Sequence, residues 1–320
     1  MEKIFENLVK DAKHILIISH VNPDGDTLGS MCAMYSAILT QYKKKSEMLV
    51  PSAIPGIYNF LPNIEKVKIL SEFDKSREYD LVITVDVAAL DRILEAQILF
   101  DKAKHTVNFD HHQTNINFGE VNFVEPHACS CGEVVFKIFE KLGWQINKDT
   151  ADALYTAILT DTGGFRFENT NPASLEIASK LVAIGVVPKE IYNNCYESKT
   201  KSVVMFQNYA VANAHFSEDE KIAYSVILRK DIEKFGVKDS ATDGIAETLR
   251  SIISTQISFV IKEIDSKTCK VSMRSKKEDV SKICEVFGGG GHKYAAGCTI
   301  KLPIKEAVKK LLQEINHEKN

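Results

Sequence analysis

The chain has 320 residues, of which 44% are hydrophobic and 26% charged, a composition typical of a globular protein large enough for two domains. No segment approaches the roughly 18 consecutive apolar residues of a membrane-spanning helix, and acidic residues throughout the first 14 positions argue against an export signal. The seven cysteines include no C-x-x-C pair, so a zinc ribbon is unsupported and a reduced, cytoplasmic protein is favoured.

The charge is unevenly distributed along the chain. The net charge is −3, yet residues 196–320 hold 21 Lys and Arg against 17 Asp and Glu, and the residues before them hold 19 against 26. An acidic first part suits the binding of cations, whereas a mildly basic second part suits an anionic ligand. A few solvated surface lysines would give the same difference in net charge between the two parts, so charge alone assigns no function.

Predicted strands and helices alternate through the first half of the chain. Residues 14–20 form a short apolar run rich in β-branched side chains, which predicts a buried parallel strand, and residues 28–42 predict a helix capped by Thr27. Residues 79–86 and 105–112 predict two further strands. Acidic or histidine side chains end or follow each of the three strands: His20, Asp24 and Asp26; Asp86; and Asp110, His111 and His112.

The carboxyl ends of parallel strands face one edge of a sheet, and open α/β sheets bind their ligands there. Asp-Gly-Asp is also ordinary turn sequence, and adjacent histidines also occur on surfaces, but three such strand ends in β–α order predict one shared site. A helix predicted over residues 149–160 leads to a further acidic residue, Asp161, which precedes Thr162 and two glycines. The segment Ser130-Cys131-Gly132-Glu133 fits a capping box, which we interpret as a helix start alone.

Carboxylates gathered in one place repel each other strongly, so such a site needs protons or cations. Oxygen ligands with a minority of imidazoles suit Mn²⁺ or Mg²⁺ better than a thiolate-binding metal, and their number fits two ions. Two metal ions about 3.5–4 Å apart can activate a hydroxide and hold a phosphoryl group, and Asp86 is the candidate for the shared ligand. The sequence contains no G-x-S-x-G motif of a serine hydrolase.

The order of predicted elements changes in the second half. Residues 188–216 predict helices that connect two domains, and Asp265-Ser266-Lys267 predicts a hairpin turn. The other predictions are strands at 222–228, 257–264, 269–273 and 298–302, and helices at 243–253, at 279–287 and from Pro303 onward. This order predicts a second, smaller α/β domain.

Four consecutive glycines, Gly288–Gly291, precede His292 and Lys293. The run fits neither G-x-G-x-x-G nor the Walker spacing, and taken alone it predicts a flexible loop. Glycine backbone N–H groups beside cations can, however, bind a phosphate or carboxylate. Arg274, two residues after Ser272, could reach the same ligand, although residues 274–277 also fit a solvated turn.

Taken in order, these motifs resemble those of the DHH phosphoesterases. The matching residues are His20-x-x-x-Asp24-x-Asp26, Asp86, Asp110-His111-His112 and Asp161-Thr162-Gly163, and Gly289-Gly290-Gly291-His292 resembles the signature of the DHH-associated domain. The length and short linker resemble the nanoRNase and pAp-phosphatase branch, the bifunctional oligoribonucleases. The resemblance implies an α/β fold with a parallel-sheet catalytic domain flanked by helices over residues 1–190, a helical linker over 191–216 and a smaller α/β substrate-binding domain over 217–320.

The resemblance also implies two Mn²⁺ ions, with Mg²⁺ or Co²⁺ as alternatives. One ion would be held by His20, Asp24 and Asp86, and the other by Asp26, Asp86, His111 and Asp161. Asp110 would orient a histidine, and His112 would face the substrate phosphate at the catalytic centre. The second domain would hold the nucleotide through Ser272, Arg274, Gly289, Gly290, Gly291 and His292.

The implied substrates are short RNA or DNA oligonucleotides, cleaved to mononucleotides, and pAp, converted to AMP. Cyclic di-AMP, or its linear product pApA, is the alternative substrate. Inorganic pyrophosphatases share the metal motifs and a basic cluster like residues 274–277 but lack the glycine-rich loop, which favours the nucleotide. A metal-loaded binding protein without catalysis is disfavoured because every catalytic position is filled. We expect a cytoplasmic enzyme without membrane attachment, which could form a homodimer.

Overall fold

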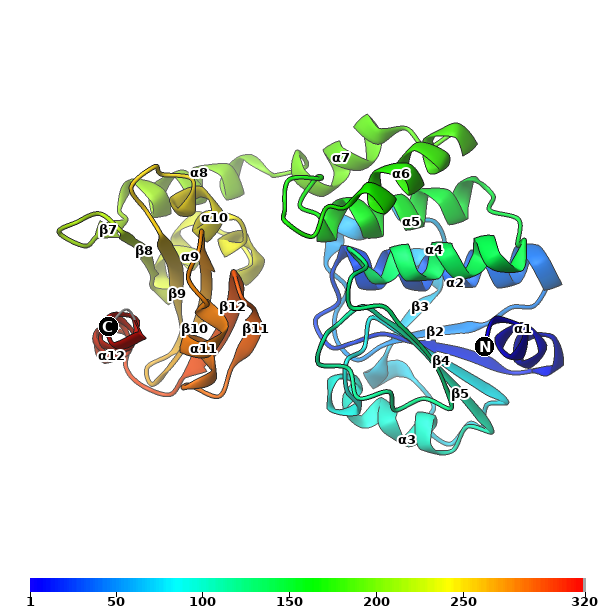
Figure 1. Cartoon of the computed structure of the whole chain (residues 1–320). Helices are drawn as coiled ribbons and strands as arrows, with labels where there is room; N and C mark the ends of the chain where they lie inside the picture. The colour runs from blue at the N-terminus through cyan, green and yellow to red at the C-terminus, as the bar shows by residue number, and fades with distance from the viewer. Residues whose placement is uncertain (319–320) are drawn as a thin grey trace. The chain divides into compact units, whose positions relative to one another are not determined.

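The computed structural model describes residues 1–318 and consists of two compact units, Met1–Ser198 and the residues from Lys199 onward (Figure 1). Each unit contains one six-stranded sheet with helices packed against it. The predicted α/β fold is therefore confirmed. Within the described residues, we find no helix that combines the length and the hydrophobicity needed to cross a bilayer.

The sheet of the first unit is entirely parallel, with the strand order β3-β2-β1-β4-β5-β6. Its strands are β1 (Ile15–Ile18), β2 (Glu47–Val50), β3 (Val67–Ile69), β4 (Leu81–Val85), β5 (His105–Asp110) and β6 (Val121–Val124). All residues of β1 and β4 are buried, which explains their continuous apolar sequences. The direction of chain progression reverses between β1 and β4, which makes their carboxyl ends the topological switch point of the sheet.

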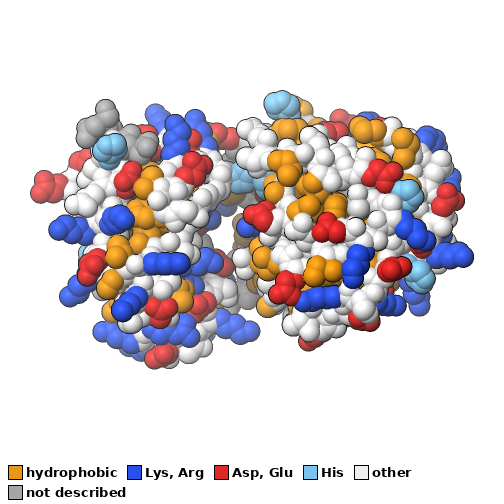
Figure 2. Space-filling view, turned by 90° about the horizontal axis from the view of Figure 1, so that it is seen from below, with side chains coloured by type: hydrophobic (Ala, Val, Ile, Leu, Met, Phe, Trp, Pro, Cys, Tyr) orange, Lys and Arg blue, Asp and Glu red, His pale blue; other side chains and the backbone are white. Residues whose placement is uncertain are grey.

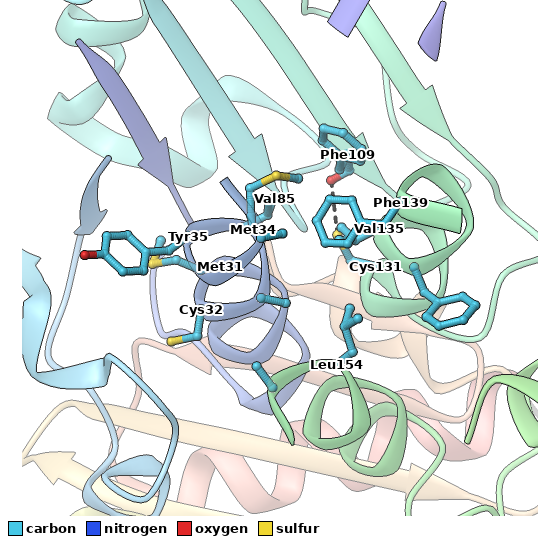
Figure 3. Close-up of a cluster of buried hydrophobic side chains, with 14 of the residues drawn as sticks. Met31, Cys32, Met34, Tyr35, Val85, Phe109, Cys131, Val135, Phe139 and Leu154 are labelled. Carbon is cyan, nitrogen blue, oxygen red and sulfur yellow. Dashed lines mark hydrogen bonds between the residues drawn. The ribbon is translucent and has the colours of Figure 1, made fainter. Parts of the chain in front are cut away.

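Helices cover both faces of this sheet (Figure 1). The helices of this unit are α1 (Glu2–Asp11), α2 (Gly25–Tyr42), α3 (Gln97–Asp101), α4 (Cys131–Leu142), α5 (Lys148–Asp161), α6 (Pro172–Ile184) and α7 (Pro188–Tyr196), and the last two pack against α5. Met31 and Met34 of α2, Phe139 of α4 and Leu154 of α5 belong to the larger core, together with Phe109 of β5 (Figure 3). Burying such a side chain contributes about 1.5–3 kcal/mol, so this core fixes α2, α4 and α5 on one face of the sheet.

The second unit combines an antiparallel region with one parallel pair, in the order β11-β12-β10-β9-β8-β7. Its strands are β7 (His215–Phe216), β8 (Ile222–Ile227), β9 (Ile257–Asp265), β10 (Thr268–Ser275), β11 (Gly290–His292) and β12 (Ala295–Ile300). Its helices are α8 (Lys201–Ala212), α9 (Arg229–Phe235), α10 (Ile245–Arg250), α11 (Val280–Glu285) and α12 (Ile304–Glu318). Two apolar clusters lie on opposite faces of the sheet, one under α11 and α12 and the other under α8, α9 and α10.

The second unit departs from the predicted elements at several positions. The hairpin of β9 and β10 is confirmed, but α9 was not predicted, and α10 ends at Arg250 rather than Ile253. The prediction of a flexible loop at the four glycines was wrong for Gly290 and Gly291, which pair with β12 as an edge strand. The helical linker over residues 191–216 stays a prediction. Within it, Ile191 and Cys195 of α7 belong to the core of the first unit, and Phe206 of α8 belongs to that of the second.

We expect Gly289→Ala and Gly290→Ala to differ sharply in stability. A Cβ atom at Gly289 would clash with the carbonyl oxygen of Gly297, whereas a Cβ atom at Gly290 would meet nothing within 4 Å. Because backbone cannot move aside as a side chain can, Gly289→Ala should lower the free energy of unfolding by about 3 kcal/mol. Gly290→Ala should change it by less than about 0.5 kcal/mol. Urea unfolding of both variants checks this, and equal losses would contradict the observed packing.

All seven cysteines are reduced and buried: Cys32, Cys129, Cys131, Cys195, Cys269, Cys284 and Cys298. Burial raises the pKa of the Cys32 thiol to about 12. A neutral buried thiol behaves as a small apolar side chain, so the cysteines contribute to packing.

Candidate active site

The candidate ligands of the first half meet at the switch point of the parallel sheet. His20 follows β1, Asp86 follows β4, and His111 follows β5, so three adjacent strands deliver them to one edge. Asp26 lies in the first turn of α2, and Asp161 is the last residue of α5. The predicted convergence of strand ends is therefore observed.

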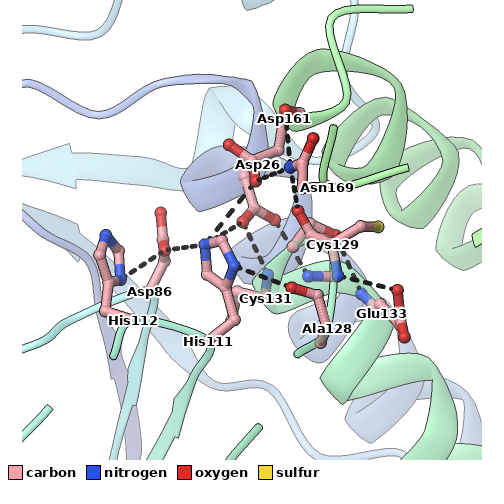
Figure 4. Close-up of polar contacts among 12 residues, drawn as sticks. Asp26, Asp86, His111, His112, Ala128, Cys129, Cys131, Glu133, Asp161 and Asn169 are labelled. Atoms are coloured by element: carbon pink, nitrogen blue, oxygen red, sulfur yellow. Dashed lines mark hydrogen bonds and ion pairs between the residues drawn. The ribbon is translucent and has the colours of Figure 1, made fainter. Parts of the chain in front are cut away.

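His111 lies at the centre of this group (Figure 4). Its Nε2 atom is 3.7 Å from Asp26 Oδ2, 3.7 Å from Asp86 Oδ1 and 3.8 Å from Asp161 Oδ2. These separations are too long for hydrogen bonds, and they leave room for an ion between the imidazole and the carboxylates. On the other side of Asp86, His20 Nε2 lies 3.2 Å from Oδ2.

Asp86 has two features that mark it as a functional residue. Its backbone adopts a left-handed conformation with φ of 59°, which costs a non-glycine residue about 1–3 kcal/mol. Its Oδ1 atom is buried and accepts no hydrogen bond from the described residues. A buried carboxylate oxygen without a donor is costly, and a cation is the partner that would satisfy it.

Among residues 1–318, three groups of side chains offer ligand atoms that lie within 4.8 Å of one another. They are His20 with Asp24 and Asp86; Asp26 with His111 and Asp161; and Asp86 with His111 and His112. The donor set, oxygen-rich with imidazoles and without thiolates, suits a divalent cation such as Mn²⁺ or Mg²⁺. The residues present therefore fit the metal dependence that the sequence predicts.

Asp26 is held by the amino terminus of α4. The backbone N–H groups of Cys131 and Gly132 donate to its carboxylate at 2.7 and 3.0 Å, and the Ser30 hydroxyl donates at 3.1 Å. Ser130 caps α4 by accepting from the backbone N–H of Glu133, as predicted. The interpretation of this segment as a helix start alone was wrong, because the same helix end also orients a candidate ligand.

Thr27 does not cap α2, contrary to the sequence-based expectation. Asp24 is the capping residue, and its carboxylate accepts the backbone N–H of Thr27 at 3.0 Å. The helix therefore begins at Gly25, and the Thr27 hydroxyl points into the site. It donates to Asp86 Oδ2 at 2.5 Å and lies equally close to His20 Nε2. Thr27 thus links two candidate ligands.

Further contacts that sequence reasoning missed orient the remaining site residues. Asp110 accepts from His112 Nδ1 at 2.7 Å and from the Asn115 side chain at 2.6 Å. The Asn169 side chain donates to Asp161 Oδ2 at 3.2 Å and also to the carbonyl oxygen of Cys129 (Figure 4). Nothing in the local sequence around the two asparagines distinguishes them from ordinary loop residues.

The carboxylates of the site have opposite pKa shifts. Burial raises the pKa of Asp26 well above its ordinary value, and the charges of Asp86 and Asp161 add to the rise. Burial would raise the pKa of Asp86 too, but the hydrogen bond and charge of His20 lower it overall. The crowded acids thus lack enough positive charge within the protein, which is the condition that bound cations relieve.

We expect Asp161→Asn to stabilise the metal-free protein at pH 8. Burial raises the pKa of Asp161 to about 7, against an ordinary value of 3.8, and the charge of Asp24 adds to the rise although His111 opposes it. Between about pH 4 and 7 the folded protein therefore holds more protons than the unfolded chain, and it loses stability as the pH rises. The Asp161 side chain is 26% exposed, so solvent screens part of this cost.

In EDTA at pH 8, urea unfolding should give Asp161→Asn a free energy of unfolding about 1–2 kcal/mol above wild type. The difference should shrink towards pH 4, where the wild-type carboxyl is protonated in both states. Asp101→Asn, at an exposed position of α3, is the control. A difference that does not change with pH would contradict this account.

The predicted substrate-binding residues all lie in the second unit. Ser272 and Arg274 are on β10, and the glycine strand β11 lies beside β12. Arg274 Nε donates to Glu247 Oε1 of α10 at 2.7 Å, and its Nη1 donates to the carbonyl oxygen of Met273. These two bonds fix the guanidinium, and Glu247 is a partner that the sequence did not reveal.

Comparisons with known proteins found similarities over most of the chain. Residues 14–158 match the DHH family, N-terminal domain, and residues 219–319 match the DHHA1 domain. The bifunctional oligoribonuclease and PAP phosphatase NrnA of Bacillus subtilis (strain 168) is 29% identical, covering 89% of each chain. The protein of the same name from Thermus thermophilus is 27% identical, covering 95% of this chain and 90% of the other.

Two other similarities extend the comparison. The cyclic-di-AMP phosphodiesterase GdpP of B. subtilis is 24% identical over 97% of this chain but only 49% of its own length. The crystal structure of an exopolyphosphatase-related protein from Bacteroides fragilis has a TM-score of 0.93 at 27% identity. That similarity covers 99% of this chain and 95% of the other.

Proposed function

Because the chain belongs to the DHH family and carries a DHHA1 domain after the DHH domain, we propose that it is a metal-dependent phosphoesterase acting on short nucleotides. It hydrolyses oligonucleotides of a few residues to mononucleotides and converts pAp to AMP. The observation that carries this proposal is the group of carboxylates and imidazoles around Asp86 Oδ1, which is buried and accepts no hydrogen bond from the described residues. The similarity to proteins named bifunctional oligoribonuclease and PAP phosphatase supplies the substrate class.

Two cation sites fit the observed groups, with Mn²⁺ as the proposed metal. His20, Asp24 and Asp86 would hold one ion, and Asp26, Asp86, His111 and Asp161 would hold the other. Asp86 would be shared, which agrees with its two oxygens facing different histidines. When bound, the ions would lower the pKa of a water molecule and offset the negative charge of a phosphate.

The chain's own residues have separate roles in this mechanism. The α4 amino terminus keeps the Asp26 carboxylate in place. Asp110 orients His112 through Nδ1, and Nε2, on the other side of the ring, would approach the substrate phosphate. Burial would lower the pKa of His112, but the hydrogen bond to Asp110 and the charge of Asp86 raise it to about 9 in the metal-free protein, where the imidazole is protonated at neutral pH. It can therefore protonate the departing oxygen.

The second unit would hold the nucleotide. Arg274, fixed by Glu247, presents a planar cation that suits a phosphate, and Ser272 lies two residues before it on β10. His292 pairs with Ala295, which pairs in turn with Arg274, so His292 and Arg274 lie at the same end of the sheet. We propose that Ser272, Arg274, His292 and the strand Gly289–Gly291 bind the phosphate or base of the substrate.

A panel of substrates tests this function. The purified full chain is assayed with Mn²⁺, Mg²⁺ or Co²⁺ on pAp, on pApA, on cyclic di-AMP and on RNA of two to five nucleotides. We expect mononucleotide release from the short RNAs and AMP from pAp, with no activity in EDTA. Absence of activity on every one of these substrates would refute the proposal.

Hydrolysis of cyclic di-AMP or pApA is the second candidate, and the similarity to GdpP favours it. The two candidates share the metal site and differ in the form of the nucleotide. The ratio of kcat/KM for cyclic di-AMP to that for a linear RNA dinucleotide distinguishes them. Inorganic pyrophosphate is included in the same assay, and its rapid hydrolysis would displace both candidates.

A further inference from the structure

A pocket of about 550 Å³ lies on the second unit, away from Arg274. Its lining includes Lys270 of β10, Thr299 of β12 and Lys301, together with Phe287 and the backbone of Gly288–Gly290. Lys270, Thr299 and Lys301 are exposed. We call this feature the lysine pocket. Figure 2 shows many basic side chains on the face of the second unit that this view presents (left).

Strand register places the lysine pocket on the same face of the sheet as Arg274. Lys270 and Arg274 are four residues apart on β10, so their side chains project to one side about 13 Å apart along the strand. On β12, their pairing partners are Thr299 and Ala295. Gly290 of β11 pairs with Gly297, between these two positions. The glycine strand therefore runs from the Arg274 end of this face, at His292, to the lysine pocket.

The protein offsets the positive charge of the pocket only in part, because among the described residues the Asp243 carboxyl interacts electrostatically with Lys270 but forms no ion pair with it. In the part of the chain that the structure describes, neither Lys270 nor Lys301 forms an ion pair, whereas other cations of this region do: Lys262 lies 3.3 Å from Asp239 Oδ2, and Arg274 binds Glu247. Lysine ammonium groups are strong phosphate binders, and glycine backbone lets a phosphate approach closely. The half-buried Phe287 also lines the pocket; its ring packs against the core under α11 and α12, with Lys310 Nζ 5.7 Å from the ring centroid.

We propose that the lysine pocket is a second phosphate subsite, which binds the backbone phosphate of a nucleotide beyond the one held near Arg274 and His292. This inference rests on the proposed function and specifies its substrate further. pAp and dinucleotides would use mainly the Arg274 end, whereas oligonucleotides of four or five residues would reach the pocket as well. The pocket would therefore determine how strongly the enzyme prefers longer oligonucleotides.

Replacement of both pocket lysines by alanine tests the proposal in the full-length protein. Binding of a fluorescent RNA pentanucleotide is measured in EDTA by anisotropy, and kcat/KM is measured with Mn²⁺ for the pentanucleotide and for pAp. Lys270→Ala/Lys301→Ala should weaken pentanucleotide binding about tenfold and reduce the slope of log Kd against log salt by about 0.7. The ratio of kcat/KM for the pentanucleotide to that for pAp should fall about tenfold. Lys309→Ala, on α12 at the opposite face, should match wild type.

A substitution that places a negatively charged side chain beside the pocket tests the proposal independently. A side chain at Gly290 projects into open space, so Gly290→Glu adds a carboxylate beside the pocket without a clash. It should weaken pentanucleotide binding more than tenfold, and Gly290→Ala, the size control, should weaken it less. Circular dichroism and the unfolding midpoint verify that both variants fold.

The outcomes separate this proposal from the proposed function. Unchanged pentanucleotide affinity and salt slope in the double variant would overturn the pocket proposal, even if wild type cleaves every RNA. Equal losses for pAp and the pentanucleotide would also overturn it, because the lysines would then act on the reacting nucleotide. Salt-dependent binding that the double variant loses, without cleavage by wild type, would refute the proposed function but support the pocket.

Discussion

Asp86→Ala is expected to abolish turnover and metal binding together, with kcat/KM lowered at least about 1,000-fold. Among the described residues, Asp86 is the carboxylate that lies within 4 Å of both His20 and His111, and its Oδ1 is buried and accepts no hydrogen bond from them. Its loss removes a ligand from both proposed cation sites. Elemental analysis after gel filtration in Mn²⁺, alongside the pAp assay, measures both effects in one preparation.

Folding controls are needed because Asp86 is buried and paired with histidines. Asp86→Asn keeps the size of the side chain and removes only its charge, so it should lose metal and activity while keeping the far-ultraviolet circular dichroism of wild type. Asp101→Asn, on the surface of α3, should retain both metal and activity. Full activity in metal-free Asp86→Asn would refute the two-cation assignment.

His112→Ala is expected to lower kcat about 100- to 1,000-fold while the metal content stays at the wild-type level. The loss is expected because the protonated imidazole, held by Asp110, is proposed to donate a proton to the departing oxygen. Substrates with a good leaving group, such as an aryl phosphodiester, need less protonation of the departing oxygen. The loss with an aryl substrate should therefore be much smaller than the loss with RNA.

Asp110→Asn serves as the companion variant. The amide keeps the shape of the Asp110 side chain but holds the His112 ring less firmly and favours its protonated form less. A loss of about 10- to 100-fold in kcat is therefore expected. His112 also belongs to a group that could hold a cation with Asp86 and His111. Loss of one metal equivalent in His112→Ala would therefore show that this histidine is a ligand instead of a proton donor.

The candidate metal ligands could be predicted from the sequence because local patterns report strand ends. An apolar, β-branched run ending in an acid or histidine places that side chain at the carboxyl edge of a parallel sheet, which needs no knowledge of distant contacts. His20, Asp86 and His111 were found in this way. Asp161 ends α5, and the local sequence marks it through the two glycines that follow Thr162.

Contacts between distant segments could not be predicted. Asp26 is bound by backbone N–H groups more than 100 residues later in the chain, and a backbone donor has no sequence signature. The Thr27 hydroxyl changes from a cap to a site residue because Asp24 starts the helix three residues earlier. Gly290 and Gly291 form a strand because β12 offers an edge, which overrides the flexibility of glycine.

Because every cysteine is buried, alkylation of the cysteines can measure the opening of each unit separately. A thiol-specific reagent attacks the thiolate, so a buried, protonated cysteine reacts only after its surroundings open. Cys32, Cys129, Cys131 and Cys195 lie in the first unit, and Cys269, Cys284 and Cys298 lie in the second. Mass spectrometry after timed alkylation should therefore resolve additions in groups of four and three if the units unfold independently. Added Mn²⁺ should delay the group of four alone, because the proposed cation sites belong to the first unit.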